Sequence, residues 1–450
     1  MRLPADVHTI ITTLRQSGYT AHVVGGCVRD SLLGLAPQDW DICTSAAPCE
    51  VKQAFAAFHT LDTGLAHGTV TVLVNGAPYE ITTYRVDGPY TGHRRPKAVH
   101  FTGSLAEDLA RRDFTMNAIV YAPGEGYTDP FGGRAAIAAK TIACVGSPHA
   151  RFEEDALRIL RAVRFAAGLG FAVQPATKAA LLEKRALLQS ISAERVNAEF
   201  CKLLLGQSAR GVLLAYRDVI AVFIPEAAAL FGFEQHSPHH LYTVWEHTAR
   251  AVQAAPPVLP LRLAAFFHDF GKPQTFTLAG GTGHFYGHAE AGAQLAEQVM
   301  RRLRFSGGLT RQVRELVYWH GSPVEPAPKQ LRRWLNRLGE EAFFMLLALK
   351  RADTLAQGNA EAPARLRRLD EAEALARSLL AENACFALKD LAVNGTDLLA
   401  AGVPKGPAVG HWLNRLLEQV LNGALPNTRP ALLRWLAAAL PGERSSAAPP

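Results

Sequence analysis

Two aspartates, Asp39 and Asp41, flank a tryptophan early in the chain. On a β-strand, side chains two residues apart point to the same face, so the two carboxylates would lie side by side. Their charges would repel unless a cation lay between them, and Mg²⁺ prefers such oxygen ligands together with substrate phosphates. The pair therefore predicts a metal site for phosphoryl or nucleotidyl transfer, although alone it would also fit an exposed acidic turn. Glu80 is a candidate third carboxylate, and a surface charge explains it equally well.

A glycine pair lies thirteen residues before the aspartates. The apolar Val23-Val24 leads into Gly25-Gly26 and then into a predicted helix that carries Arg29. Glycines let backbone N–H groups approach an anion, and a helix N-terminus favours negative charge. A tight turn would explain the glycines alone, but together with the aspartates they indicate a site for nucleotide phosphates.

Two further segments carry side chains suited to a nucleotide. Arg111-Arg112 precedes Asp113 and Asn117, and paired guanidinium groups bind phosphates bidentately. Asp155 and Arg158 are three residues apart, so on one helix they would share a face. They would form a salt bridge, or they would read a base, because an acceptor beside a donor matches the edges of cytosine and adenine and not those of uracil and guanine.

Histidines are concentrated in one later segment, where eight of the sixteen fall within residues 236–320. His247 and the adjacent pair His268-Asp269 are followed much later by Asp353. Neutral imidazoles with a neighbouring carboxylate form a mixed nitrogen and oxygen site for a divalent metal. Of the remaining histidines, His284, His288 and His320 are candidates for a second metal or a phosphate.

The elements that must position these residues follow from hydrophobic patterning. We expect an amphipathic helix within residues 1–22, a mixed α/β unit over 23–145 and helices almost throughout from about residue 150. Alternating residues 69–74 and 79–84 around Asn75-Gly76 are typical of a β-hairpin. The clearest predicted helices are 153–169, 178–188, 195–205, 295–303 and 340–350.

Composition sets the broad class. The chain has 450 residues, 48% hydrophobic and 19% charged, which is enough for about three folded domains and argues against disorder. A net charge of +7 permits a polyanionic partner. There is no apolar run of 18 residues and no signal-like N-terminal segment, so we expect no membrane contact. Six scattered cysteines fit reduced thiols in the cytoplasm.

The motifs, taken together, resemble those of bacterial class II tRNA nucleotidyltransferases, the CCA-adding enzymes, and of related poly(A) polymerases. The matching segments run in order through residues 20–205: GGCVRDSLLG, DWDICTSA, VDGPYTGHRRP, EDLARRDFTMNAI, DPFGG, RFEEDALRILRAVRFA and ISAERVNAEF. The third resembles a loop of CCA-adding and A-adding enzymes that is typically missing from enzymes adding only CC. The segment His268-Asp269 resembles an HD-superfamily phosphohydrolase.

The resemblance implies an α+β fold. A polymerase-beta-like nucleotidyltransferase head with a small mixed sheet would be followed by all-α neck, HD and tail domains. We expect the head over residues 1–145, the neck with its base-selecting template over 146–235, the HD domain over 236–360, a helical tRNA-binding tail over 361–442 and a disordered tail over 443–450.

The resemblance also implies roles for single residues. Asp39 and Asp41 would be catalytic and hold Mg²⁺, and Glu194-Arg195 would support the template helix. Nucleotide binding would involve Gly25, Gly26, Arg29, Arg111, Asp113, Asn117, Asp155, Arg158 and Arg161. The HD metal, a second divalent transition metal, would be held by His247, His268, Asp269 and Asp353.

The implied function is template-independent addition of C, C and A from CTP and ATP to the 3′ end of tRNA by two-metal in-line transfer, with amino-acid side chains selecting the base. One alternative is an A-adding tRNA nucleotidyltransferase or a poly(A) polymerase. An alternative of another class is an HD-domain phosphohydrolase acting on RNA 3′ ends. A non-catalytic RNA-binding scaffold fits poorly because both carboxylate sets are present. The sequence leaves open the oligomeric state, the HD metal and its substrate.

Overall fold

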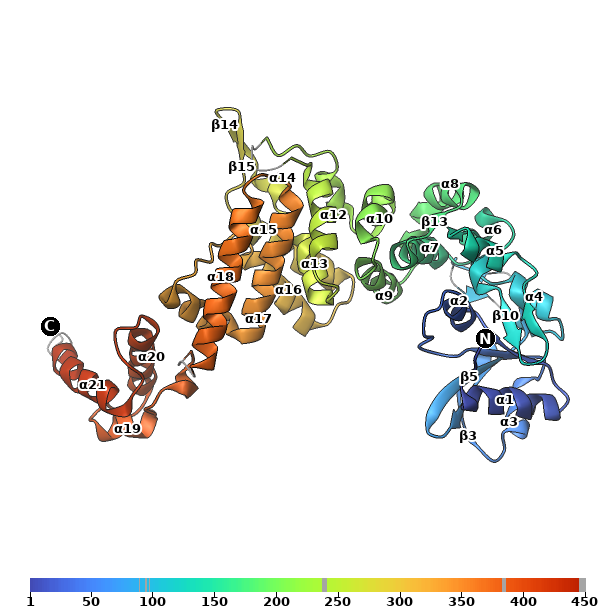
Figure 1. Cartoon of the computed structure of the whole chain (residues 1–450), viewed down its shortest axis with the longest axis horizontal. Helices are drawn as coiled ribbons and strands as arrows, with labels where there is room; N and C mark the ends of the chain where they lie inside the picture. Colours follow the sequence, from blue (N-terminus) through green and yellow to red (C-terminus); the bar gives the residue numbers. More distant parts are fainter. Residues whose placement is uncertain (89, 94, 97, 237–240, 383–385, 445–450) are drawn as a thin grey trace. The chain divides into compact units, whose positions relative to one another are not determined.

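The computed structural model describes residues 1–88, 90–93, 95–96, 98–236, 241–382 and 386–444 (Figure 1). The chain divides into two compact units, Met1–Ala229 with Val299–Phe305, and Leu230–Gln298 with Ser306–Pro450. Pro89 and Arg94 of the predicted loop lie outside the described residues, as do residues 445–450 of the tail that is predicted to be disordered over 443–450. The finer partition into head, neck, HD and tail domains stays a prediction.

A seven-stranded mixed sheet forms the centre of the first unit, in the order β11-β10-β1-β2-β5-β4-β3. Only β2 and β5 run parallel, and every other neighbouring pair is antiparallel. The small mixed sheet that the sequence predicts is therefore confirmed. Its strands are β1 (Ala21–Val24), β2 (Ile42–Thr44), β3 (His59–Gly64), β4 (Thr69–Val74), β5 (Ala77–Thr83), β10 (Val120–Ala122) and β11 (Gly126–Thr128).

The predicted hairpin is confirmed. Strands β4 and β5 are joined by Asn75 and Gly76, whose φ angles of 52° and 81° are those of a tight hairpin turn. The register pairs Thr71 with Glu80, and this pairing places both residues beside the candidate site described below.

Short helices and strands complete the head. The apolar stripe Val7, Ile10, Ile11 and Leu14 is buried along the predicted N-terminal helix, which ends before Gly18. The elements are α1 (Ala5–Gln16), α2 (Gly26–Leu32), α3 (Pro48–Ala54), η1 (Leu65–His67), β6 (Arg85–Asp87), β7 (Tyr90–Thr91), β8 (Arg95–Pro96), β9 (Val99–Phe101), α4 (Leu105–Ala110), η2 (Thr115–Asn117), α5 (Gly133–Ala138) and β12 (Thr141–Ile142).

Helices follow from residue 148, as predicted, but one predicted helix is wrong. The segment 153–169 is two helices, because Asp155 has extended angles, φ −130° and ψ 102°. Its side chain accepts a hydrogen bond from the Leu157 N–H, which satisfies a free donor at the start of the second helix. The elements are α6 (Pro148–Glu154), α7 (Leu157–Leu169), β13 (Ala172–Val173), α8 (Pro175–Lys184), η3 (Arg185–Ser190), α9 (Ala193–Leu204), α10 (Ala209–Ala215), α11 (Arg217–Phe223) and η4 (Pro225–Leu230).

The second unit is helical apart from the small hairpin of β14 (Thr277–Ala279) and β15 (Thr282–His284). Its helix α17 is kinked at Gly339, and none of the described helices is long and apolar enough to span a membrane. The helices are α12 (Val244–Ala254), α13 (Leu259–Phe267), α14 (Lys272–Thr275), α15 (His288–Arg302), α16 (Gly307–Trp319), α17 (Pro328–Gln357), α18 (Ala362–Ala381), η5 (Leu388–Asp390), α19 (Gly395–Ala400), α20 (Pro407–Leu421) and α21 (Arg429–Arg444).

Candidate active site and metal centre

Asp39 and Asp41 line one cavity of about 480 Å³ together with Trp40, Thr71 and Glu80. The expectation that the two aspartates lie on a strand is wrong, since β2 begins at Ile42, one residue after Asp41. The Asp41 carbonyl nevertheless accepts a hydrogen bond from the N–H of Val24 on β1, so the sheet still anchors the segment. The cavity is within the usual size range of small-molecule sites, about 300–1,000 Å³.

The folded protein disfavours the charged form of the Asp41 carboxyl group. Its side chain is open to the cavity, yet surrounding protein displaces water, and this desolvation together with the charge of Asp39 raises the pKa of Asp41 to about 6. The Arg112 guanidinium opposes the shift, and the Glu80 carboxylate adds to it. Crowded oxygen ligands of this kind are stabilised by a divalent cation, so the residues fit Mg²⁺. Among the described residues, Glu80 forms no cluster with the two aspartates in which all ligand atoms lie within 4.8 Å of one another.

Gly25 lies beside Asp41. It ends β1 and precedes α2 with φ 81° and ψ −129°, angles that favour glycine. A Cβ atom at this position would lie 3.4 Å from Nη1 of Arg112 and 3.9 Å from Oδ2 of Asp41. The strand–glycine–helix arrangement predicted for Gly25-Gly26 is therefore present, and it adjoins the Asp41 carboxylate.

Four predicted nucleotide-binding side chains form one hydrogen-bonded network. Nη1 of Arg29 donates to Oδ1 of Asn117 at 2.8 Å, and Nδ2 of Asn117 donates to Oδ1 of Asp113 at 3.0 Å. Nε of Arg161 donates to Oδ2 of Asp113 at 2.9 Å. Burial opposes the charge on Asp113, but Arg161 and Asn117 lower the pKa of Asp113 to about 2. The network thus joins α2 of the head to α7 through a permanently charged carboxylate.

The other three predicted nucleotide-binding side chains have separate partners. Oδ2 of Asp155 accepts from Nη2 of Arg195 at 3.0 Å. Arg158 is buried and donates to Glu154 at 2.7 Å and to the Arg111 carbonyl at 2.9 Å. Asp155 lies outside the helix that carries Arg158, so the two do not share a helix as the sequence suggested, but the Arg158 N–H donates to the Asp155 carbonyl at 3.0 Å. The Arg111 guanidinium binds Asp108.

The sequence analysis gave Arg112 no role apart from its pairing with Arg111, and it gave Glu199 none. Arg112, and not Arg111, is the arginine beside Gly25 and Asp41. Glu199 on α9 is buried and pairs with Arg164 at 2.8 Å and with Arg161 at 3.7 Å. The Arg111-Arg112 pair was visible in the sequence, but its pattern did not show which member faces the glycines. Glu199 lies on the apolar face of an amphipathic helix, and a buried charge there is a signal that a partner arginine is near.

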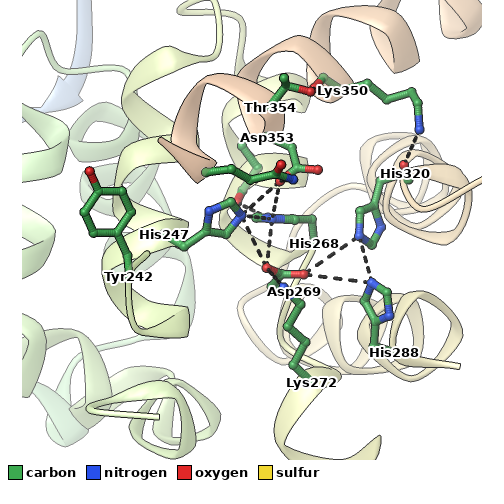
Figure 2. Close-up of polar contacts among 12 residues, drawn as sticks. Tyr242, His247, His268, Asp269, Lys272, His288, His320, Lys350, Asp353 and Thr354 are labelled. Atoms are coloured by element: carbon green, nitrogen blue, oxygen red, sulfur yellow. Dashed lines mark hydrogen bonds and ion pairs between the residues drawn. The ribbon is translucent and has the colours of Figure 1, made fainter. Parts of the chain in front are cut away.

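In the second unit, the four residues of the predicted metal site converge (Figure 2). His247 comes from α12, His268 and Asp269 follow α13, and Asp353 comes from α17. Nε2 of His247 lies 3.1 Å from Nε2 of His268 and 3.0 Å from Oδ1 of Asp353. Burial disfavours the charge on Asp353, but the contacts with His247 and His268 hold the pKa of that carboxyl well below its usual value.

A second group of ligand atoms lies on the other side of Asp269. His288 and His320 place their Nε2 atoms 3.2 Å apart, and both rings face Asp269 (Figure 2). Burial lowers the pKa of His320 to about 3, so this imidazole is neutral at physiological pH. His284, the remaining candidate, instead stacks on the Tyr286 ring.

A cavity of about 380 Å³ opens next to these ligands. Its lining includes His320, Asp353 and Lys350, together with Arg365 and Arg368 of α18. Cationic side chains beside a candidate metal site suit an anionic ligand such as a phosphate ester.

Three protein families match consecutive parts of the chain. Residues 21–143 match the poly A polymerase head domain, and residues 170–231 match a "Probable RNA and SrmB- binding site of polymerase A". Residues 287–436 match domain 2 of tRNA nucleotidyltransferases.

Relatives match over nearly the whole chain. The CCA-adding enzyme of Lacticaseibacillus paracasei is 35% identical over 94% of each chain. The solved structure of the Bacillus stearothermophilus CCA-adding enzyme in complex with CTP is 30% identical, with a TM-score of 0.71 over 99% of this chain and 100% of that one. A Thermotoga maritima CCA-adding enzyme complexed with tRNA is 19% identical, with a TM-score of 0.58 over 96% and 94%, and this likeness shows the fold alone.

The raised pKa of Asp41 predicts that its charged carboxylate lowers the stability of the metal-free protein, although the same carboxylate is needed to bind the metal. Its folded-state value of about 6 exceeds the usual 3.8, so the metal-free first unit should gain stability as pH falls from 7 through 6 towards 4. Replacing the carboxylate in Asp41→Asn should therefore raise the free energy of unfolding at pH 7.5 by about 1 kcal/mol or less, after allowing for screening in the open cavity. The same change should remove stabilisation by Mg²⁺.

Denaturant unfolding in chelator and in Mg²⁺, at pH 5 and pH 7.5, measures both effects. Asp62→Asn is the matched control, because Asp62 is exposed and pairs with Lys52 on the surface. An Asp41→Asn protein that is less stable than wild type in chelator, or that is still stabilised by Mg²⁺, would contradict the assignment.

Proposed function

Because this chain belongs to the family of CCA-adding enzymes, we propose that it adds C, C and A to the 3′ end of tRNA, using CTP and ATP without a nucleic-acid template. The proposal rests above all on Asp39 and Asp41, which line one cavity, and on the position of the Asp41 carboxylate beside Gly25. In the reaction, the tRNA 3′ oxygen bonds to the α-phosphorus, pyrophosphate leaves, and the hydroxyl proton is released to water.

Different residues of the head would bind the metal and the triphosphate. Asp39 and Asp41 would hold Mg²⁺, which supplies a Lewis acid that lowers the pKa of the attacking hydroxyl and offsets charge on the phosphates. The backbone of Gly25 and Gly26 and the Arg29 side chain would bind the triphosphate. Arg112 contributes a cation beside Gly25, where a phosphate would enter.

The network around Asp113 would orient the nucleotide. Asn117 and Arg161 are both held by the Asp113 carboxylate, so their remaining donors have fixed directions. Arg111 would bind the same nucleotide after leaving Asp108, to which it donates two hydrogen bonds. Held donors of this kind bind a ligand with little loss of side-chain entropy.

Base selection would use Asp155 and Arg158. We propose that both exchange their internal partners, Arg195 and Glu154, for the edge of the incoming base. The Asp155 carboxylate accepts from an exocyclic amino group, and the Arg158 guanidinium donates to the neighbouring ring nitrogen. Uracil and guanine would leave both groups unpaired.

The cellular setting follows from the substrates. We propose a cytoplasmic enzyme, where tRNA and both nucleotides are at hand. All five described cysteines carry free thiols, which fits a reducing compartment.

An A-adding enzyme or a poly(A) polymerase is the nearest alternative function, since the head also matches the poly A polymerase family.

A second candidate function comes from the histidine and aspartate cluster. His247, His268 and Asp353 place one ligand atom each within 4.8 Å of one another. With Asp269 beside them, we propose that they bind a divalent transition metal for hydrolysis of a phosphoester. In that reaction a water oxygen bonds to phosphorus, the ester oxygen leaves, and a proton of the water passes to it.

Truncated tRNAs distinguish the proposed addition from its alternatives. We expect tRNA lacking the last three nucleotides to take up two C and then one A, and tRNA ending in CC to take up A alone, when each labelled nucleotide is supplied separately and together. Incorporation of A but never of C into any of the substrates would assign the chain to the A-adding or poly(A) class.

Changing Asp155 tests base selection. Asp155→Asn keeps an oxygen that can accept from Leu157 N–H but presents an amide donor to the base, so discrimination against UTP should fall about tenfold or more. The measurement is kcat/KM for each of the four nucleotides on tRNA lacking CCA. Glu153→Gln, two residues away and exposed, is the control. If the folded variant keeps the wild-type ratios of kcat/KM among the four nucleotides, Asp155 has only a structural role.

Changing His268 tests whether the two sites work independently. His268→Ala should lower the bound transition metal and any phosphomonoester hydrolysis, while nucleotide addition stays within about twofold of wild type. His284→Ala, which lies outside both clusters, serves as control. Loss of nucleotide addition in folded His268→Ala protein would show that the sites are coupled.

A further inference from the structure

The cavity that Asp39 and Asp41 line continues to the hairpin of β4 and β5. Part of its wall is the segment Ala77–Glu80 of β5, and the Trp40 side chain lies in the same wall. None of the described residues that line the cavity comes from Gly25-Gly26 or from α2. The cavity is therefore distinct from the place beside Gly25 that the proposed function gives to the triphosphate.

The charge of the cavity wall excludes phosphates as its main ligand. Three carboxylic acids, Asp39, Asp41 and Glu80, line the cavity, and the described lining residues include no lysine or arginine. Phosphate groups bind where such cations or free N–H groups are at hand. An uncharged group with a free hydroxyl suits this wall better, because a carboxylate accepts hydrogen bonds from hydroxyls.

Two aromatic rings form the less polar part of the wall. Trp40 and Tyr79 both line the cavity, and each is half-buried, so part of each side chain stays accessible. The Tyr79 hydroxyl donates to Oδ2 of Asp6 at 3.1 Å, and Nδ2 of Asn75 donates to Oδ1 of the same carboxylate at 2.8 Å. These bonds hold the hairpin on α1, so the Tyr79 ring binds a flat ligand with little loss of side-chain entropy.

Nucleotide addition needs a second substrate next to the aspartates. The attacking and leaving oxygens lie roughly in line at the phosphorus, so the acceptor hydroxyl must approach from the side opposite the pyrophosphate. With the triphosphate beside Gly25, the acceptor needs a separate space that adjoins Asp39 and Asp41. The cavity supplies about 480 Å³ there, within the usual range of small-molecule sites.

The acceptor also changes its last base during the reaction. It ends first in whatever base precedes the added sequence, then in C and then in CC. A site that read the base edge by hydrogen bonds would reject some of these ends. An aromatic ring stacks on any base, since every base has a π face.

We propose that the 3′-terminal nucleoside of the tRNA binds in this cavity, with its base stacked on Trp40 and Tyr79. Its terminal hydroxyl then faces Asp39 and Asp41. The inference rests on the proposed addition to tRNA and names the site that holds the acceptor end. The two rings hold this end without selecting its base, whereas Asp155 and Arg158 would select the incoming base.

An acceptor without its last base separates stacking from a structural role. The two substrates are tRNA ending in CC and the same tRNA with an abasic terminal residue, each with ATP. Trp40→Leu should lower kcat/KM for the complete tRNA about tenfold and leave the KM for ATP unchanged. On the abasic tRNA, wild type and Trp40→Leu should differ by less than about twofold. Tyr127→Leu, which removes a half-buried ring of β11 outside the cavity, is the control.

Fluorescence measures the same contact without turnover. The probe is tRNA whose last C is replaced by pyrrolocytosine, which stacking quenches. Wild type, Tyr127→Leu and Tyr79→Phe, which keeps the ring, should quench the probe when it is bound at saturation. Trp40→Leu and Tyr79→Leu should leave most of its emission.

Equal quenching by wild type and both leucine variants of the cavity would overturn the acceptor site. An equal loss of kcat/KM on the complete and the abasic tRNA would overturn it as well. Neither result would affect the proposed function, which stands as long as wild type adds C, C and A in the truncated-tRNA assay. A wild-type protein that adds no nucleotide would overturn both.

Discussion

Repulsion between the carboxylates of Asp39 and Asp41 is the constraint on which the head depends. The sheet holds Asp41 through its carbonyl, and the fold places Gly25, whose positive φ favours glycine, in contact range of Arg112 and the Asp41 carboxylate. Burial and the charge of Asp39 raise the pKa of Asp41, so the charged carboxylate destabilises the metal-free protein. Active sites that stabilise the charge of a transition state commonly lower the stability of the folded protein, and interactions elsewhere in the fold must offset this loss.

The sequence predicted those parts of the fold and site that depend on local pattern. The Asn75-Gly76 turn fixes the hairpin and its register, and the register brings Glu80 to the cavity of Asp39 and Asp41. The apolar stripe of the first helix predicted its buried face. These features need only residue periodicity and turn chemistry, both of which can be read along the chain.

Features that depend on tertiary partners were not predictable. Asp155 interrupts a strongly helical pattern because Arg195 and the Leu157 N–H bind its side chain, and neither partner is implied by spacing along one helix. Which of Arg111 and Arg112 faces the glycines depends on Asp108, whose carboxylate binds both. The convergence of the histidines around Asp269 likewise depends on how the five helices α12, α13, α15, α16 and α17 pack.

Anomalous diffraction from crystals soaked in Mn²⁺ and CTP would show whether Asp39 and Asp41 bind one metal ion beside the nucleotide. We expect an anomalous peak within bonding distance of both carboxylates, with the triphosphate lying along Gly25 and Gly26. Side chains of the two aspartates that point apart, with Mn²⁺ bound to the nucleotide elsewhere in the chain, would contradict it.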